Sequence, residues 1–192
     1  NQVTFGGNCE TGLSVTVDLG GSGEGSASCA GGTWTYTTAS QTIDATYNYT
    51  FKQTDGAGNM ASTSGRYIRD NIAPVMTFTS SSSMVTASNT VTFTGTCESG
   101  LPASIVVAGG SDSSTATCNA GSWTYTTANQ TTDATRTYTF TQTDQAGNAA
   151  TISATWERNT AVPNLLITST SPLYNGNDTA HVAGNCETGL NI

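Results

Sequence analysis

Five cysteines stand at regular intervals, so thiol chemistry is the first chemistry that the sequence offers. Cys9 precedes Cys29 by 20 positions, Cys97 precedes Cys118 by 21, and Cys186 stands alone. A structural zinc ion needs four ligands, and two thiols per pair with one histidine in the chain do not supply them. The spacing predicts one disulfide in each pair, with the partner of Cys186 beyond Ile192, and an oxidising compartment.

Carboxylate and amide side chains form a second group with a recurring pattern. The stretch Gln-Thr-Asp-x-Ala-Gly-Asn places Asp55 and Asn59 together near the start of the chain, and Asp144 and Asn148 together later. Calcium prefers such oxygen ligands, and glycine in a short loop lets backbone carbonyls turn inward as further ligands. The competing interpretation is a turn in which Asp accepts backbone N–H groups and Gly147 has a positive φ.

Composition excludes several classes of function. With five Lys and Arg and a net charge of −8, the chain lacks the clustered cations that nucleic acid requires. No apolar run reaches the roughly 18 residues of a membrane span, so no membrane insertion is expected from this segment. The only histidine, His181, lies outside any repeated motif, and a catalytic triad needs a base beside its nucleophile. We therefore expect no enzymatic activity and no catalytic residues.

The cysteines and the Asp-x-Ala-Gly-Asn stretches recur because the chain is built from tandem repeats. Four pairs of residues share an offset of 89 positions: Cys29 and Cys118, Trp34 and Trp123, Pro74 and Pro163, and Cys97 and Cys186. The chain is therefore predicted to be an array of three blocks. Residues 1–70 form a repeat that lacks its first strand, residues 71–159 form a complete repeat, and residues 160–192 begin a truncated third one. This arrangement indicates a window from a longer protein.

The complete block is predicted to contain seven short strands separated by turns. They are expected at residues 75–79, 91–96, 104–108 and 115–118, around Trp123 and Tyr125, around Tyr138 and Phe140, and at 152–156. Alternating apolar and polar residues favour strands, and no segment has the apolar stripe of a helix. The predicted class is all-β, with near-zero helix and about seven strands per immunoglobulin-like sandwich, packed around Trp123, Tyr125, Tyr138, Phe140 and Trp156.

Three strings in the complete block resemble the bacterial immunoglobulin-like repeats of large surface adhesins. They are Gly-Thr-Cys97-Glu-Ser-Gly-Leu, Gly121-Ser-Trp123-Thr-Tyr and Thr-Asp144-Gln-Ala-Gly-Asn148. The resemblance implies tandem sandwiches on a secreted or surface-anchored protein, as a stalk or as adhesive modules. In some repeats of that family calcium binds at the junctions. The cysteines are a departure, because the commonest members lack them.

If the seven strands alternate in direction, the acidic loops lie at the end of the domain where the chain enters it. Glu98, Asp144 and Asn148 are then expected near Asp70 and Asn71. We take these five residues as candidate calcium ligands, and the first block contributes a second candidate set, Glu10, Asp55 and Asn59. The next junction has Asn159 in place of Asp70, which counts against an ion.

The sequence thus predicts a non-enzymatic array that forms the shaft of a bacterial surface adhesin or extracellular fibre. Its expected partners are neighbouring repeats or identical subunits, and no cofactor is required unless Ca²⁺ binds at the junctions. Three alternatives remain open: a module that binds a host or surface glycan or protein, an accessory segment of a secreted enzyme, and a self-assembling filament. In the filament, the end of one chain would supply the strand that the first block of the next chain lacks.

Overall fold

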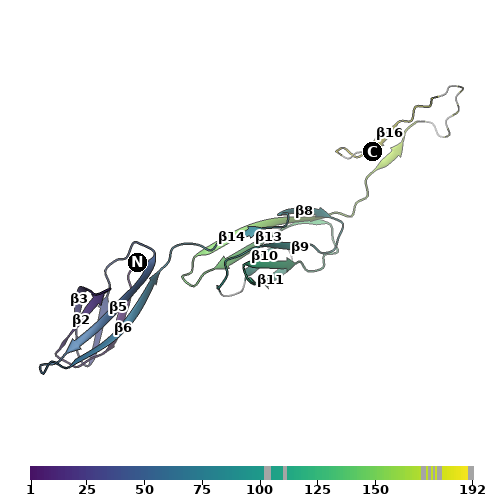
Figure 1. The fold of residues 1–192 in the computed structure, drawn as a ribbon. Coiled ribbons are helices and arrows are strands. Elements are labelled where there is room, and N and C mark those ends of the chain that lie inside the picture. Colours follow the sequence, from purple (N-terminus) through teal and green to yellow (C-terminus); the bar gives the residue numbers. More distant parts are fainter. Residues whose placement is uncertain are drawn as a thin grey trace. The chain divides into compact units, whose positions relative to one another are not determined.

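The computed structural model describes residues 1–101, 105–109, 112–169, 172, 174, 176 and 179–189. This part of the chain is all-β, as predicted, and its 16 strands are accompanied by no helix. No helix suited to crossing a membrane is therefore found among the described residues. The backbone clusters into two compact units, residues 1–75 with 142–150 and residues 76–141 with 151–192. Figure 1 shows the strands of each.

The first repeat is a sandwich of two antiparallel sheets. The larger sheet has the order β3-β2-β5-β6, and the smaller one pairs β1 with β4. Their bounds are β1 (Thr4–Asn8), β2 (Ser14–Leu19), β3 (Ser22–Ser28), β4 (Thr33–Thr37), β5 (Ala45–Thr54) and β6 (Met60–Arg69). Side chains alternate between the faces of each strand, so every second residue of β2 and β5 enters the core. The buried core residues are Val15, Val17, Ala27, Trp34, Tyr49 and Phe51.

The second repeat has the same two layers with additional edge strands. One sheet has the order β11-β10-β13-β14-β8 and the other β12-β9-β7. Their bounds are β7 (Thr77–Phe78), β8 (Ser83–Thr86), β9 (Thr92–Thr96), β10 (Ile105–Gly109), β11 (Asp112–Ala116), β12 (Ser122–Thr126), β13 (Ala134–Thr143) and β14 (Ala149–Arg158). The five aromatic residues predicted for its core are all buried. In the first repeat Trp34, Tyr49 and Phe51 are buried, whereas Tyr36 and Tyr67 are half-buried.

This repeat contains eight strands where seven were expected, because its first strand divides between the two sheets. β7 pairs antiparallel with β9, and after a short crossing β8 pairs parallel with β14. The crossing runs through four consecutive serines, residues 80–83. Ser80 Oγ accepts the amide of Thr94 at 3.1 Å, and Ser81 Oγ donates to the carbonyl of Ser83 at 2.6 Å. Short hydroxyl side chains satisfy the backbone where neither sheet does.

Other strand boundaries differ from the prediction by one to three residues. The fourth expected strand, 115–118, is observed as β11, which ends at Ala116 and so leaves Cys118 outside the sheet. The third expected strand, 104–108, is observed from Ile105, and Ser104 lies outside the described residues.

The third block contributes one short antiparallel pair in the described residues. β15 (Leu165–Ile167) pairs with β16 (Gly184–Cys186), and all six residues are exposed.

Candidate functional site

The two disulfides each join the two sheets of one sandwich. Cys9 follows β1 and Cys29 follows β3, while Cys97 follows β9 and Cys118 follows β11. The Cα atoms lie 5.9 Å apart in the first bridge and 6.0 Å in the second. In both repeats the bridge therefore ties a strand end of one sheet to a strand end of the other. Cys186 is exposed and has no disulfide partner among the described residues, so a partner beyond Ile192 stays a prediction.

The Asp-x-Ala-Gly-Asn stretch forms the tip of the hairpin between β5 and β6. Asp55 Oδ1 accepts the amides of Ala57 and Asn59, both at 2.8 Å. Its other carboxylate oxygen accepts Nδ2 of Asn59, also at 2.8 Å. The loop closes with Gly58 at φ 89°. These bonds to the charged form, above all the one from the Asn59 side chain, lower the pKa of the Asp55 carboxyl.

The hairpin between β13 and β14 repeats this geometry. Asp144 Oδ1 accepts the amide of Asn148, and Oδ2 accepts Nδ2 of the same residue, both at 2.8 Å. Gly147 has the predicted positive φ, 92°. The bond from the Asn148 side chain is the main cause of the lowered pKa of Asp144. Two loops 89 positions apart therefore use the same three residues in the same way.

In both loops the side chains taken as candidate calcium ligands are engaged in hydrogen bonds of the turn itself. Both carboxylate oxygens of each Asp already accept N–H groups of their own loop, and each Asn presents its amide nitrogen to the carboxylate. A calcium ion needs six to eight oxygens pointing at it. Across the described ranges, no three or more His, Cys, Asp or Glu side chains are grouped closely enough to hold a metal. In this geometry the loop is a capped turn.

The linker residue Asp70 also serves a turn. Its Oδ1 accepts the amide of Ile72 at 3.0 Å, and its backbone carbonyl accepts Nδ2 of Asn148 at 3.3 Å. At the matching position, Asn159 Oδ1 accepts the amide of Ala161 at 3.0 Å. A turn of this kind needs one side-chain oxygen, which both Asp and Asn supply. Asp70 and Asn159 therefore stabilise the same kind of turn at the two junctions.

The remaining candidate ligands, Asn71, Glu10 and Glu98, are exposed. Glu10 is held through its backbone by Gln53. Gln53 Oε1 accepts the amide of Glu10 at 2.9 Å, and its Nε2 donates to the Glu10 carbonyl at 3.0 Å. Gln53 lies on β5, so this side chain connects the large sheet to the loop that follows β1. We did not predict this role, although the Gln of each repeated motif was its signal.

A repeated ion pair closes the opposite end of each sandwich. Arg69 at the end of β6 pairs with Asp44, and Arg158 at the end of β14 pairs with Asp133. The sequence analysis did not identify these two pairs. The common offset of 89 positions for both partners was the signal that would have identified the pair.

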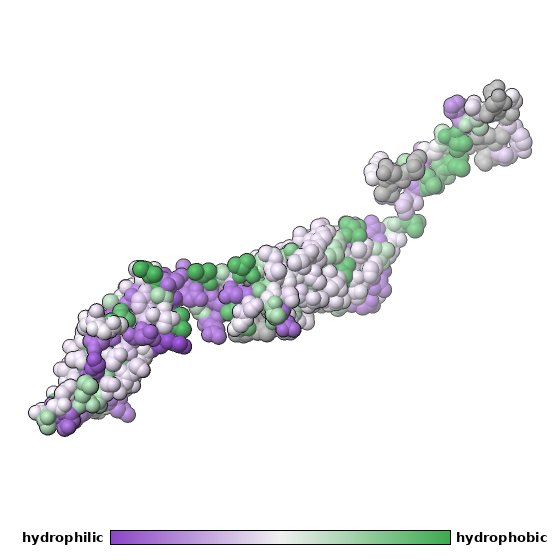
Figure 2. Space-filling view, in the orientation of Figure 1, coloured by the Kyte–Doolittle hydropathy of each residue, from purple (hydrophilic) through white to green (hydrophobic). Residues whose placement is uncertain are grey.

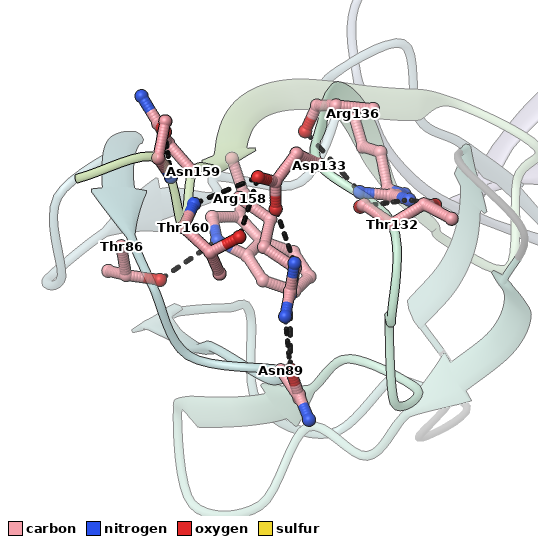
Figure 3. Close-up of polar contacts among 11 residues, drawn as sticks. Thr86, Asn89, Thr132, Asp133, Arg136, Arg158, Asn159 and Thr160 are labelled. Carbon is pink, nitrogen blue, oxygen red and sulfur yellow. Dashed lines mark hydrogen bonds and ion pairs between the residues drawn. The ribbon is translucent and has the colours of Figure 1, made fainter.

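The second of these pairs is the centre of a larger network, which Figure 3 shows. Arg158 Nε and Nη2 donate to Asn89 Oδ1 at 3.1 and 2.9 Å. Asp133 Oδ2 accepts the amide and the hydroxyl of Thr160 at 2.9 and 2.7 Å. The bonds from Thr160, with the charge of Arg158, lower the pKa of Asp133. The Arg158 guanidinium thus connects the end of β14 with Asn89, which precedes β9, and with Asp133, which precedes β13.

Comparison with known proteins gives a family profile and several structural similarities. The profile of the bacterial Ig-like domain matches residues 2–70 and 76–157. No curated protein sequence matches the chain.

Among solved structures, the tetra-tandem repeat in the extending region of a large adhesion protein shares 20% identity, with a TM-score of 0.43, over 86% of this chain and 47% of that one. A Ca²⁺-stabilized adhesin with which an Antarctic bacterium binds ice shares 19%, with a TM-score of 0.37, over 89% and 48%. The titin domains z1z2 in complex with telethonin share 15%, with a TM-score of 0.33, over 81% and 86%. The chain spans about half the length of the two adhesin structures.

Proposed function

Because the chain belongs to the bacterial Ig-like domain family, we propose that it is a non-enzymatic structural array that forms the shaft of a bacterial surface adhesin or extracellular fibre. The units of this array are residues 1–70, 71–159 and 160–192. Their partners in this role are neighbouring repeats and identical subunits, and their location is outside the cell.

One observation carries the proposal: the polar groups that recur between the repeats bind within their own sandwich. The cysteines join the two sheets, Asp55 and Asp144 close their own hairpins, and Arg69 and Arg158 bind the Asp of the same repeat. Repetition of residues that hold a sandwich together is what a spacer requires. Each further unit then adds length and nearest-neighbour contacts.

The disulfides also support the extracellular location. Paired cysteines persist where the surroundings are oxidising, and they compensate for the modest core of a repeat of fewer than 100 residues. The chain is also poor in charge, since charged residues make up only 9% of it.

The spacer role is tested by placing the chain between a cell-surface anchor and a reporter domain of known ligand. The full chain, and a version from which residues 76–164 are deleted, are displayed on the same bacterium. The ligand is bound to beads, at the bottom of a narrow polymer brush. We expect capture of these beads to fall when one repeat is deleted. An unrelated immunoglobulin-like unit of similar length inserted at the same place should restore capture.

The same fusions distinguish a binding module from a spacer. A chain without the reporter domain should not bind glycan arrays or host-cell surfaces. Binding by that chain, or failure of the unrelated unit to restore capture, would contradict the shaft role. A glycan- or protein-binding module would then be the better account.

A further inference from the structure

In the second repeat, the second half of the first strand runs parallel to the last strand. β8 pairs with β14 over all four of its residues, and Figure 1 shows the two strands side by side. Backbone bonds extend the pairing at both ends. The amide of Thr155 donates to the carbonyl of Ser82 at 2.8 Å, and the amide of Asn159 donates to the carbonyl of Thr86 at 2.9 Å. The strands by which the chain enters and leaves the repeat are therefore bound directly to each other.

Two side-chain hydrogen bonds cross the same pair of strands. Thr155 Oγ1 donates to Ser83 Oγ at 3.3 Å, and the indole Nε1 of Trp156 donates to Thr86 Oγ1 at 3.1 Å. The outer faces of the strands are rich in Thr and Ser, and Figure 2 shows a largely pale surface over the second repeat, the colour of such residues. Trp156, in contrast, is 0% exposed, so water has little access to its indole and the bond to Thr86 is the stronger of the two.

A third side-chain connection lies just beyond the paired residues, where Arg158 binds the segment that follows β8. Its Nε and Nη2 donate to Asn89 Oδ1 at 3.1 and 2.9 Å, as Figure 3 shows. The same guanidinium pairs with Asp133, whose carboxylate also accepts the amide and the hydroxyl of Thr160. The end of β14 is thereby bound both to the continuation of β8 and to the loop that precedes β13.

The direction of these strands decides how a pull along the chain acts on them. Such a pull enters a repeat at its first strand and leaves at its last, so it draws β8 toward its beginning and β14 toward its end. Because the bonds of a parallel ladder are evenly spaced along the strands, two strands that slide past each other load all of the bonds at once. If both strands were pulled from the same end, the bonds would break one after another. β7 pairs only two residues with β9, so most of the resistance falls on β8 and β14.

We propose that β8 and β14 form a tension clamp, and that the bonds from Trp156 to Thr86 and from Arg158 to Asn89 set the load that the second repeat bears. This inference rests on the proposed shaft role, because a shaft is pulled along its length when it holds a cell in place. It adds a function that spacing alone does not require, since the repeat keeps its folded length under tension. Both bonds lie at the end of β8 that is farther from the entering chain, so they are loaded only when the two strands are pulled past each other.

The test compares two directions of pull on the full chain at constant force. In the shear arrangement, handles are attached to azide-bearing residues that replace Ala73 and Ala161, two exposed residues on either side of the second repeat. In the peel arrangement they replace Ala73 and Gln145, an exposed residue of the hairpin tip from which β14 begins. Forced unfolding is governed by the unfolding rate. At equal force, the second repeat should unfold at least about tenfold faster in the peel arrangement than in the shear arrangement.

Substitutions then test the bonds that set the load. Thr86→Val keeps the shape of the side chain and removes the acceptor of Trp156 Nε1, so unfolding should become about tenfold faster in the shear arrangement. In the peel arrangement the same change should accelerate unfolding less than about twofold, because the first bonds to break lie at the other end of β8. Thr126→Val is the matched control. It removes the hydroxyl bond to Thr92 between β9 and β12, and should change either rate less than about twofold.

Asn89→Ala is a second variant, at an exposed position, that keeps the test decisive if Thr86→Val disturbs the core. It should also accelerate unfolding severalfold in the shear arrangement alone. Equal unfolding rates of the parent chain in the two arrangements would overturn the proposal. So would equal effects of Thr86→Val and Thr126→Val under shear, or equal acceleration of Thr86→Val and Asn89→Ala in both arrangements, which would indicate a general loss of stability. None of these outcomes alters the bead-capture result that tests the shaft role, so the two proposals fail independently.

Discussion

Gln53 binds both backbone polar groups of Glu10, accepting its amide at 2.9 Å and donating to its carbonyl at 3.0 Å. The Gln53 side chain of β5 thereby supplies hydrogen bonds of the kind that a neighbouring strand would give. Glu10, which receives them, lies outside any sheet. The same side chain reaches the carbonyl of Leu13 at 3.4 Å. The loop that follows the first cysteine is consequently fixed by the disulfide on one side and by Gln53 on the other.

Replacing Gln53 with Ala should destabilise the first repeat by about 1–3 kcal/mol, because two to three hydrogen bonds are lost and the Glu10 amide loses its acceptor. Urea unfolding monitored by circular dichroism measures the change. Gln145→Ala, in an exposed loop position of the second repeat, is the control and should cost less than about 0.5 kcal/mol. Equal stabilities of the two variants would contradict the proposed role of Gln53.

Acid should destabilise both repeats through the Asp residues that their own loops hold. The lowered pKa values of Asp55, Asp133 and Asp144 mean that the folded state favours the charged carboxylate. Their contribution is therefore fully present above the unfolded pKa of about 3.9 and is lost as the pH falls through the lower folded pKa.

Asp144→Asn provides the check on this pH dependence. At pH 7 the variant should melt at a lower temperature than the parent, and the difference should shrink as the pH falls below about 4, where the parent carboxyl also loses its charge. Thermal melts at a series of pH values measure this. A difference in melting temperature that stays constant from pH 7 to pH 2 would show that the charge of Asp144 does not hold the loop.

Calcium should leave the melting temperature unchanged, because Asp55 and Asp144 already use both carboxylate oxygens within their loops. Melts with millimolar calcium and with excess chelator make the comparison. A rise with calcium that disappears in Asp144→Asn would instead show that the loop opens and rearranges to bind the ion.

The fold was largely predictable from the sequence because the relevant signals are local or repeated. Alternation of Val91 and Phe93 with threonines fixes which face of a strand is buried, and the buried core residues of the second repeat follow from the same rule. The division of the first strand was not predictable in this way. Ser80 and Ser81 have the composition of a loop, and only the positions of both sheets reveal that they lead the chain from one to the other.

The polar contacts were less predictable because they depend on pairs distant in sequence. Arg158 and Asp133 are 25 positions apart, and neither residue alone indicates an ion pair. For Asp144 and Asn148 the sequence allowed both a calcium loop and a capped turn, since both use the same residues. In the structure the Asn148 amide turns its nitrogen toward the carboxylate, which is the arrangement of the capped turn.

Arg158 should not be replaceable by Lys, whereas Arg69 should tolerate the exchange better. Arg158 uses its planar fork to bind Asn89 and Asp133 at once, a geometry that an ammonium group does not reproduce. Loss of the bonds to Asn89 alone should cost about 1 kcal/mol or more. Arg69 pairs with Asp44, but its Nε is buried without a hydrogen-bond partner among the described residues. Replacing Arg69 with Lys therefore loses fewer hydrogen bonds. Urea unfolding of Arg158→Lys and Arg69→Lys compares them, and a larger loss at position 69 would contradict this account.

Reducing the disulfides should lower the melting temperature and lengthen each repeat when it is pulled apart. The bridges span 20 and 21 positions, and closing a loop of that size contributes about 3 kcal/mol in the chain-entropy model. While intact, each bridge also hides its loop from an applied force. At about 3.5 Å per extended residue, reduction should add roughly 70 Å to the contour length released by each unfolding repeat. Single-molecule force spectroscopy with and without reductant measures this increment. In the control variant Cys97→Ala with Cys118→Ala, the second repeat should show the long increment under both conditions, whereas the first repeat still responds to reductant. Equal increments for the parent chain before and after reduction would mean that the bridges do not limit its extension.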